Sequence, residues 1–251
     1  MSTTAAPKPK RRTRERVLAL SLKLFNDFGE PNVTTTTISA AMEISPGNLY
    51  YHFRNKDEIV NDIFAVFERE MDELLVAGAR RSVTIEDMWL FLHVLFETIW
   101  KYRFLYRDLS DLLSRNRLLE VEFKRILDQK VKTTEAMFRS LASTGALAPG
   151  DHNLEALATN MMVVATYWLS FAYVRNPRNF VESEVSAEGA YQVMSLLAPY
   201  LRGESRALFV KLADAYKAVP LPQNTGKIAS TPISRGGRDG KNKVDPVSAP
   251  G

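Results

Sequence analysis

Apolar residues recur every three or four positions along most of the chain, which is the spacing of an amphipathic α-helix. The first such segment covers 13–28 and should end at Gly29, because glycine readily adopts the left-handed conformation that closes a helix. No segment sustains the two-residue alternation of a half-buried strand. We therefore predict an all-α fold.

Start and stop signals divide the rest of the chain into further helices. Ser45-Pro46 is the clearest start, because serine can cap free amides and proline tolerates the first helical position. Breaks are expected at Gly145, at Pro149-Gly150 and at Asn176-Pro177. The helices predicted after the first are 34–42, 46–53, 56–79, 84–101, 104–114, 117–144, 153–174, 186–201 and 204–218.

Composition excludes several classes of protein. The chain has no cysteine, so it has no disulfide, thiolate chemistry or cysteine-type zinc site. Its first sixteen residues lack the apolar run of a signal peptide. The most apolar stretch, 161–174, is shorter than the ~20 residues of a membrane-spanning helix. We expect a soluble, cytoplasmic protein with no membrane partner.

Charge is unevenly distributed although the net charge is only +4. Up to Arg54 there are eight basic and four acidic side chains. Residues 55–220 carry twenty basic and twenty-three acidic side chains. From Leu221 onward the counts are five and two. A basic first segment on a nearly neutral body suggests that one end meets a polyanion, although basic tails can also be merely solvated.

The segment from Thr34 to Phe53 has the layout of a helix-turn-helix, with two short helices joined by a tight turn at Glu43-Ile44. Gly47 lets the backbone amides of the second helix approach a phosphate or base edge. The apolar positions that can lock the helices together are Ile38, Met42, Ile44, Leu49 and Phe53. The positions left to point outward are Asn48, Tyr50, Tyr51 and His52.

This segment resembles the DNA-binding signature of the TetR family of bacterial regulators. The resemblance lies between Gly29 and Ile59 and includes the run from Ile44 to Phe53 followed by Lys56. It departs from the family at the turn, where Glu43 replaces the usual glycine. If the backbone there is left-handed, glutamate costs on the order of 1 kcal/mol; we expect its side chain to point away from DNA.

The resemblance implies DNA contacts at the matching positions. Tyr50, His52 and Lys56, with Thr34 or Thr35, would hold phosphates, whereas Asn48 and Tyr51 would face base edges. For His52 and Tyr50, packing between helices is the alternative. The implied contacts are Thr34, Thr35, Ser45, Pro46, Gly47, Asn48, Tyr50, Tyr51, His52 and Lys56. The basic residues that could add contacts from a flexible arm are Lys10, Arg11, Arg12 and Arg14.

Domain boundaries follow from these signals. Residues 1–12 and 221–251 lack a periodic apolar pattern, so we predict a disordered basic arm and a disordered tail. Between them we expect a helix-turn-helix DNA-binding domain over 13–55, a linking helix over 56–79, and a larger ligand-binding and dimerisation domain over 80–220.

The larger domain carries no short motif with chemistry, but it is rich in aromatic residues. Family resemblance implies a cavity there for an apolar or amphipathic effector, although core packing is the alternative for each aromatic side chain. Part of this domain is similar to TetR-type regulators associated with polyhydroxyalkanoate gene clusters, which implies a fatty-acyl or acyl-CoA effector. The candidate ligand residues are Trp89, His93, Phe96, Trp100, Arg103, Tyr106, Arg107, Met137, Tyr167 and Trp168.

A homodimer is expected, because one short recognition helix covers only a few base pairs. The resemblance places the interface on the helices at about 154–174 and 186–201, with packing inside one chain as the alternative. The apolar residues expected there are Leu157, Val164, Trp168, Val193, Leu196 and Leu197.

Three other functions were considered. An enzyme, a metal site and a cofactor are not expected, because no phosphate loop, nucleophile elbow or metal-ligand pair occurs and the three histidines are scattered. A helix-turn-helix used only for protein contacts would not bind duplex DNA in a salt-dependent way. A protein that coats DNA without preference would select no palindromic consensus.

Overall fold

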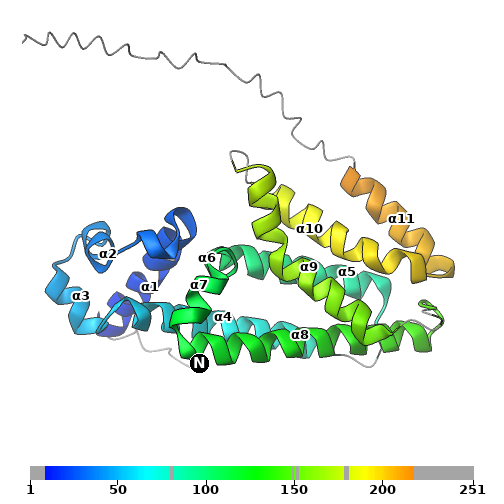
Figure 1. Ribbon diagram of the computed structural model, residues 1–251, viewed down its shortest axis with the longest axis horizontal. Coiled ribbons are helices and arrows are strands. Elements are labelled where there is room, and N and C mark those ends of the chain that lie inside the picture. Colours follow the sequence, from blue (N-terminus) through cyan, green and yellow to red (C-terminus); the bar gives the residue numbers. More distant parts are fainter. Residues whose placement is uncertain (1–8, 80–81, 149, 151–152, 178–180, 218–251) are drawn as a thin grey trace, which may run out of the picture. The chain divides into compact units, whose positions relative to one another are not determined.

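Helices make up the regular secondary structure of the computed structural model, which describes residues 9–79, 82–148, 150, 153–177 and 181–217 (Figure 1). The all-α prediction is confirmed for these residues. The α-helices are α1 (Pro9–Phe28), α2 (Thr35–Ala41), α3 (Pro46–His52), α4 (Lys56–Gly78), α5 (Ile85–Lys101), α6 (Arg103–Arg107), α7 (Leu109–Arg115), α8 (Arg117–Ser143), α9 (Leu154–Arg175), α10 (Glu182–Leu197) and α11 (Gly203–Lys217). Two 3-10 turns, η1 (Glu30–Asn32) and η2 (Ala198–Tyr200), follow α1 and α10.

Helix α1 begins at Pro9, four residues before the predicted start. Proline is favourable in a first helical turn, and the basic residues that follow it are good helix formers. The last four residues of the predicted arm, 9–12, therefore belong to a helix. Residues 1–8 of the arm and the whole predicted tail lie outside the described residues.

Two other predicted helices differ from the structure. The helix expected at 104–114 is divided into α6 and α7 at Asp108, whose φ of −101° and ψ of 19° are not helical. The helix expected at 186–201 begins earlier, at Glu182, and ends at Leu197. Pro199 follows in η2, where proline cannot donate the hydrogen bond that would continue an α-helix.

Helices α1 to α3 pack around apolar side chains that belong to the one hydrophobic core of the described residues. Phe25 of α1, Ile38 of α2 and Leu49 of α3 are buried there, as is Phe53 directly after α3. Ile44, in the turn, is half-buried against the same core. The residues expected to lock the helix-turn-helix together are thus found at its centre.

The larger body is built around α4 and α8, which pack along each other (Figure 1). Helix α5 packs against α4 and α10, and α9 packs against α8 and α10. Aromatic rings fill the contact between α4, α6 and α8, where Phe67 lies 6.0 Å from Tyr106 and 6.2 Å from Phe123 between ring centroids.

Hydrogen bonds join the end of α1 to the start of α6. Asn26 donates from Nδ2 to the Lys101 carbonyl at 2.9 Å and accepts from the Phe104 amide at 3.1 Å. Arg107 donates to the carbonyl of Phe25 at 2.8 Å and to that of Asn26 at 3.3 Å. Arg107 thus caps the end of α1: it supplies a donor to the Asn26 carbonyl and a second donor to the Phe25 carbonyl, which also accepts from the Gly29 amide at 3.0 Å.

A buried carboxylate strengthens this junction. Glu30 of η1 is fully buried, and Lys56 at the start of α4 pairs with it at 2.9 Å. Arg115 at the end of α7 forms a second ion pair with Glu30. The Glu30 amide in turn donates to Asp108 Oδ2 at 3.1 Å. Three segments of the chain thus meet at one buried acidic side chain.

Candidate nucleic-acid interface

The helix-turn-helix is held by local hydrogen bonds at both helix starts. Ser45 Oγ accepts from the Asn48 amide at 3.2 Å, which confirms the predicted cap of α3. Thr34 Oγ1 accepts from the Thr37 amide at 3.1 Å and caps α2 in the same way. In the turn between them, the Ile44 amide donates to the Ser39 carbonyl at 3.0 Å.

Glu43 has a φ of 57°, so the turn is left-handed at this residue, which is the condition under which glutamate is strained in place of glycine. The residue is exposed. A side chain in this conformation places its Cβ close to the following carbonyl oxygen. The turn forms despite this cost because the surrounding backbone hydrogen bonds and the core contacts of Ile38 and Leu49 hold it.

Replacing Glu43 with glycine should therefore stabilise the protein. We expect the free energy of unfolding to rise by about 1 kcal/mol, because glycine adopts a positive φ without a steric penalty. Urea unfolding monitored by circular dichroism would measure this change. Glu15→Gly, at an exposed position inside α1, is the control and should destabilise the protein. No gain at Glu43 would show that the turn is unstrained.

The exposed side of α3 carries most of the side chains singled out from the sequence. Tyr50 and Tyr51 are 52% and 68% exposed, and Asn48 is exposed as well. The Tyr50 hydroxyl lies 3.2 Å from Thr35 Oγ1, which connects α3 to α2. A Cβ at Gly47 would meet one atom of the described residues within 4 Å, Ser45 Oγ at 4.0 Å. We call Thr35, Asn48, Tyr50 and Tyr51 the α3 surface; its groups can donate and accept hydrogen bonds.

His52 differs from the other α3 candidates. Its side chain is only 9% exposed and lies edge-to-face against Tyr51 at 5.3 Å between ring centroids. The expectation that His52 points outward is therefore wrong. The physical reason is helical spacing: His52 follows buried Leu49 by three positions and shares its face. A phosphate contact by His52 stays an untested prediction.

Lys56 is half-buried and its ammonium group is shared with Glu30, through the carboxylate and through the backbone carbonyl at 3.0 Å. The sequence indicated only a phosphate contact for this lysine. A partner 26 positions earlier in the chain could not be recognised from the local pattern. The phosphate contact stays a prediction, and the ion pair adds a structural role.

Arg14 does not belong to a flexible arm. It lies within α1, pairs with Asp62 at 2.6 Å and with Glu58 at 3.3 Å, and its guanidinium group covers the Phe53 ring at 4.2 Å. It also donates to the His52 carbonyl. The Arg54 amide and Arg14 lower the pKa of Glu58 below its usual value. Of the basic arm residues, Arg12 is exposed in α1.

The ten ligand candidates do not gather into one cavity. The two arginines contact the end of α1: Arg103 pairs with Asp27 at 3.0 Å, and Arg107 donates to the Phe25 carbonyl at 2.8 Å. Tyr167 is exposed, and His93 is half-buried with Nδ1 2.9 Å from the Trp89 carbonyl. The others are buried in the core: Trp89, Phe96, Trp100, Tyr106, Met137 and Trp168. Burial of these six side chains agrees with the alternative interpretation, in which they pack in the core.

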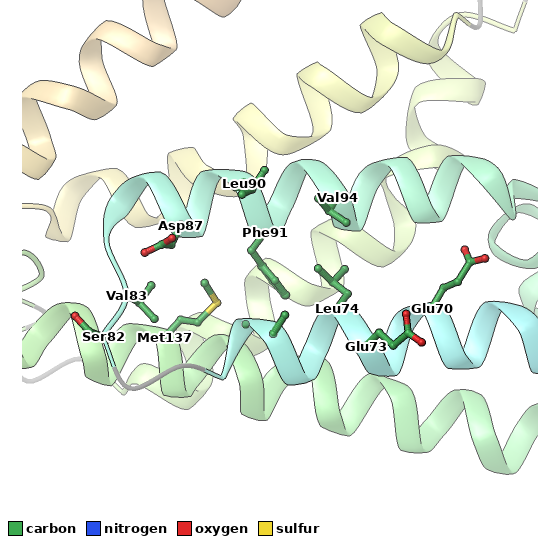
Figure 2. Close-up of a pocket in the computed structure, with 12 residues that line it drawn as sticks. Glu70, Glu73, Leu74, Ser82, Val83, Asp87, Leu90, Phe91, Val94 and Met137 are labelled. Atoms are coloured by element: carbon green, nitrogen blue, oxygen red, sulfur yellow. The ribbon is translucent and has the colours of Figure 1, made fainter. Parts of the chain in front are cut away.

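A pocket of about 360 Å³ opens between α4, α5 and α8 (Figure 2). Figure 2 shows Phe91 and Val94 of α5 facing Leu74 of α4, with Met137 of α8 near Val83. Met137 is the one ligand candidate among its lining residues. The lining residues are Glu70, Glu73, Leu74, Ala77, Gly78, Ser82, Val83, Asp87, Leu90, Phe91, Val94 and Met137.

Sequence reasoning missed the α4 wall of this pocket because 56–79 was treated only as a linking helix. A signal was present: Glu73 and Leu74 lie three and four positions after Glu70, and Ala77 lies four and three positions after them, so the four residues share a face. Across the described residues, no group of three or more histidine, aspartate or glutamate side chains is arranged to hold a metal ion.

Lys130 is a fully buried lysine on α8. Its ammonium group donates to the Tyr106 hydroxyl at 2.8 Å, and Tyr106 is also fully buried. Burial lowers the pKa of Lys130 to about 7, and it raises the pKa of Tyr106 above the usual range of a phenol. The sequence did not single out Lys130, since lysine on a long helix is usually solvated.

The low pKa of Lys130 predicts a specific dependence of stability on pH. Between pH 7 and about 10 the unfolded chain holds this proton more tightly than the folded protein, so the free energy of unfolding should rise with pH. The expected gain is on the order of 3 kcal/mol. Above pH 10 the raised pKa values of Tyr102 and Tyr106 act in the opposite direction.

Urea unfolding at pH 7, 8.5 and 9.5 would measure this effect. Lys130→Met should flatten the dependence, whereas Lys132→Met, which changes an exposed lysine on the same helix, should leave it unchanged. Identical pH profiles for the wild type and Lys130→Met would contradict the assignment.

Helix α9 presents apolar side chains on its outer face. Val163, Tyr167 and Phe171 follow at four-residue spacing and are all exposed, and Val174 continues the row one turn later. We call these four residues the α9 stripe. By length and composition α9 could also cross a membrane, a test that buried core helices pass too, and 44% of its apolar window is buried.

Four of the six residues expected at a dimer interface pack inside the subunit. Leu157, Trp168, Val193 and Leu197 are buried in the chain, and the Trp168 indole donates to the Val185 carbonyl at 2.8 Å. The expectation for these four is corrected, because their side chains are already buried within a single chain and cannot meet a second one. Val164 is half-buried, and Leu196 is 37% exposed.

A helix-turn-helix with an exposed second helix, joined through one long helix to a larger helical body, defines a class of DNA-binding regulators. Two family models agree with this architecture. Residues 17–63 match the bacterial regulatory proteins of the tetR family, and residues 66–209 match the TetR model described as a bacterial transcriptional repressor. The chain belongs to the TetR family of transcriptional regulators.

Individual relatives show the same resemblance. A TetR-family regulator from Marinobacter aquaeolei VT8 is 37% identical, covers 81% of this chain and 98% of its own, and has a TM-score of 0.75. The HTH-type regulator AcrR of Shigella flexneri is 28% identical over 97 residues, or 36% of this chain. The biofilm operon regulator IcaR of Staphylococcus epidermidis is 27% identical over 122 residues, or 48% of this chain. The chain spans only 44% and 64% of the last two relatives.

Proposed function

We propose that the protein is a dimeric repressor that binds a palindromic operator through the α3 surface and releases it in response to a small effector. TetR-family regulators bind DNA and small molecules and act as dimers. The observation that carries the proposal for this chain is the exposure of Asn48, Tyr50 and Tyr51 on a capped helix beside a tight turn. Its place of action would be the bacterial cytoplasm.

The groups of the α3 surface suit both parts of DNA recognition. Tyr50 and Thr35 would hold phosphates together, since their hydroxyls already lie 3.2 Å apart. Asn48 and Tyr51 would read base edges in the major groove. Thr34, Ser45, Pro46, Gly47, His52 and Lys56 complete the proposed contact set. Lys56 would reach a phosphate only while it also neutralises Glu30.

The α9 stripe is the dimer interface in this proposal. Exposed Val163, Tyr167, Phe171 and Val174, with Leu196 of α10, would pair with the same residues of a second subunit in a four-helix bundle. Two α3 helices would then meet half-sites about one turn of DNA apart.

The effector would be a small apolar or amphipathic molecule bound in the body, with fatty-acyl compounds and acyl-CoA as the chemical classes to test. Binding must favour one of two arrangements of the dimer, since a ligand shifts an equilibrium only by its differential affinity. The contacts of Asn26 and Arg107 between α1 and α6 provide a route from the body to the DNA-binding domain.

Selection of binding sites from random duplexes tests the proposal. We expect a palindromic consensus with half-sites separated by about one helical turn. A pool without consensus would instead indicate a protein that coats DNA, and no retained DNA would indicate a helix-turn-helix used for protein contacts. An effector that binds tightly but leaves operator affinity unchanged would contradict the sensing role.

A further inference from the structure

The body contains an amine that its own side chains do not neutralise. Lys130 is the one lysine or arginine that is buried among the described residues, and it has no solvent exposure. Its Nζ donates to Tyr106 at 2.8 Å and lies 5.0 Å from the centre of that ring. Among the described residues, no carboxylate lies within ion-pair distance of Nζ. Lysine is almost never fully buried unless it is paired.

Glu30 shows how the same chain treats a buried charge elsewhere. Its carboxylate, also without solvent exposure, is matched by Lys56 and Arg115. Lys130, in contrast, has only the neutral hydroxyl of Tyr106 as a hydrogen-bond partner among the described residues. Because an uncompensated buried ammonium group is costly, an apolar residue at this position would serve folding better. The cost indicates that the amine has a use other than stability.

The amine and two buried hydroxyl groups, those of Tyr106 and Thr134, supply hydrogen-bond donors in this part of the body. An ammonium group has three donors, of which the Tyr106 oxygen takes one. The Tyr106 hydroxyl retains its own proton. Thr134, one turn after Lys130 on the same face of α8, is fully buried and its Oγ1 has no hydrogen-bond partner. Lys130, Tyr106 and Thr134, which we call the buried donor site, thus carry donor hydrogens beyond the one that the Tyr106 oxygen accepts, and the described part of the chain offers no carboxylate to receive them.

The surroundings of this site are apolar. Phe67 and Phe123 pack on Tyr106 at 6.0 Å and 5.6 Å between ring centroids. The pocket between α4 and α5 is lined by Glu70, Glu73 and Asp87, which would repel an anion. The other cationic candidates, Arg103 and Arg107, are engaged with the end of α1. An anionic group bound inside the body would therefore find its counter-charge at Lys130.

We propose that the buried donor site binds the carboxylate of an apolar organic acid, which is the effector. Lys130 would form an ion pair with one carboxylate oxygen, while Tyr106 and Thr134 would donate to the remaining lone pairs. The hydrocarbon part would lie among Phe67 and Phe123 after these side chains move apart. The inference rests on the proposed function, because it assigns the effector of the repressor.

The position of Tyr106 connects this site to DNA binding. Tyr106 lies on α6, next to Arg107, which donates to the Phe25 and Asn26 carbonyls of α1. A carboxylate that draws Tyr106 and Lys130 to itself would act on the short helix that holds the DNA-binding domain.

Isothermal titration of the full-length protein with straight-chain carboxylates from hexanoate to tetradecanoate, without DNA, tests the proposal. At least one should bind the wild type. Lys130→Met should weaken it at least about 10-fold. Tyr106→Phe and Thr134→Val, which each remove a neutral donor, should weaken it about 3-fold. Lys132→Met, at an exposed lysine on the same helix, should bind as the wild type does.

Three results would overturn the proposal. They are the absence of binding by every carboxylate, equal affinity of Lys130→Met and the wild type, and tighter binding of the corresponding methyl ester or CoA thioester. If urea titration shows no unfolding transition for Lys130→Met, the variant is not folded and Lys130→Gln is used in its place. Operator binding by the same protein preparations is measured in a separate experiment. If the wild type bound a carboxylate but no operator, the repressor function would be contradicted and the carboxylate site would not.

Discussion

Tyr51→Ala should weaken operator binding by at least about 30-fold. Tyr51 is 68% exposed on the α3 surface, so its ring and hydroxyl can reach a duplex while one edge of the ring packs against His52. A lost base or phosphate contact costs about 1 kcal/mol or more in each subunit, and the change occurs twice in the dimer. Fluorescence anisotropy with the selected operator would measure the loss.

One control outside α3 and two variants within it make this result specific. Phe28→Ala removes an aromatic side chain that is equally exposed but lies at the end of α1, and it should leave affinity within about 2-fold. Asn48→Ala should change which base pairs are preferred, whereas Tyr50→Ala should weaken binding to all sequences. Unchanged affinity of Tyr51→Ala would exclude the ring from the interface.

Glu30→Gln should destabilise the protein by about 2–4 kcal/mol. Glu30 is fully buried between Lys56 and Arg115, and a neutral amide would leave both cations without their shared partner. Both cations keep partial access to water, which limits the loss. Urea unfolding would measure the change. Because Glu30 also holds the start of α4 against α7, the linkage between the two domains should loosen.

Asp111→Asn is the matched control for Glu30. Asp111 also pairs with Arg115, at 3.0 Å, but its side chain is exposed. Exposed ion pairs contribute little, so its replacement should cost less than about 1 kcal/mol. If the two substitutions had equal effects, burial of Glu30 would not be the source of its contribution.

Local signals were sufficient for the fold and for much of the DNA-binding end. Ser45-Pro46 begins a helix whichever domain surrounds it, because the cap and the proline act within one turn. At Glu43 the resemblance showed only that glycine is usual, and the structure supplies the reason, a positive φ. Exposure of Asn48, Tyr50 and Tyr51 follows from subtracting the apolar positions of a short helix.

His52 was misplaced although its helical spacing from Leu49 is local, whereas the other features that the sequence did not reveal depend on partners distant in the chain. Lys56 is paired with Glu30, and Arg107 with the end of α1, through contacts that no local pattern reveals. Aromatic side chains such as Trp89 and Trp168 fit a core and a ligand cavity equally well in the sequence, and only packing separates these roles. Lys130 was overlooked because its burial depends on the helices that close over α8.

The salt dependence of operator binding tests the central claim most directly. The logarithm of the association constant for the selected operator should fall linearly with the logarithm of salt concentration, with a slope on the order of −4. A scrambled duplex should bind far more weakly at each salt concentration. Affinity that does not change with salt, or that is equal for both duplexes, would contradict recognition of DNA by the α3 surface.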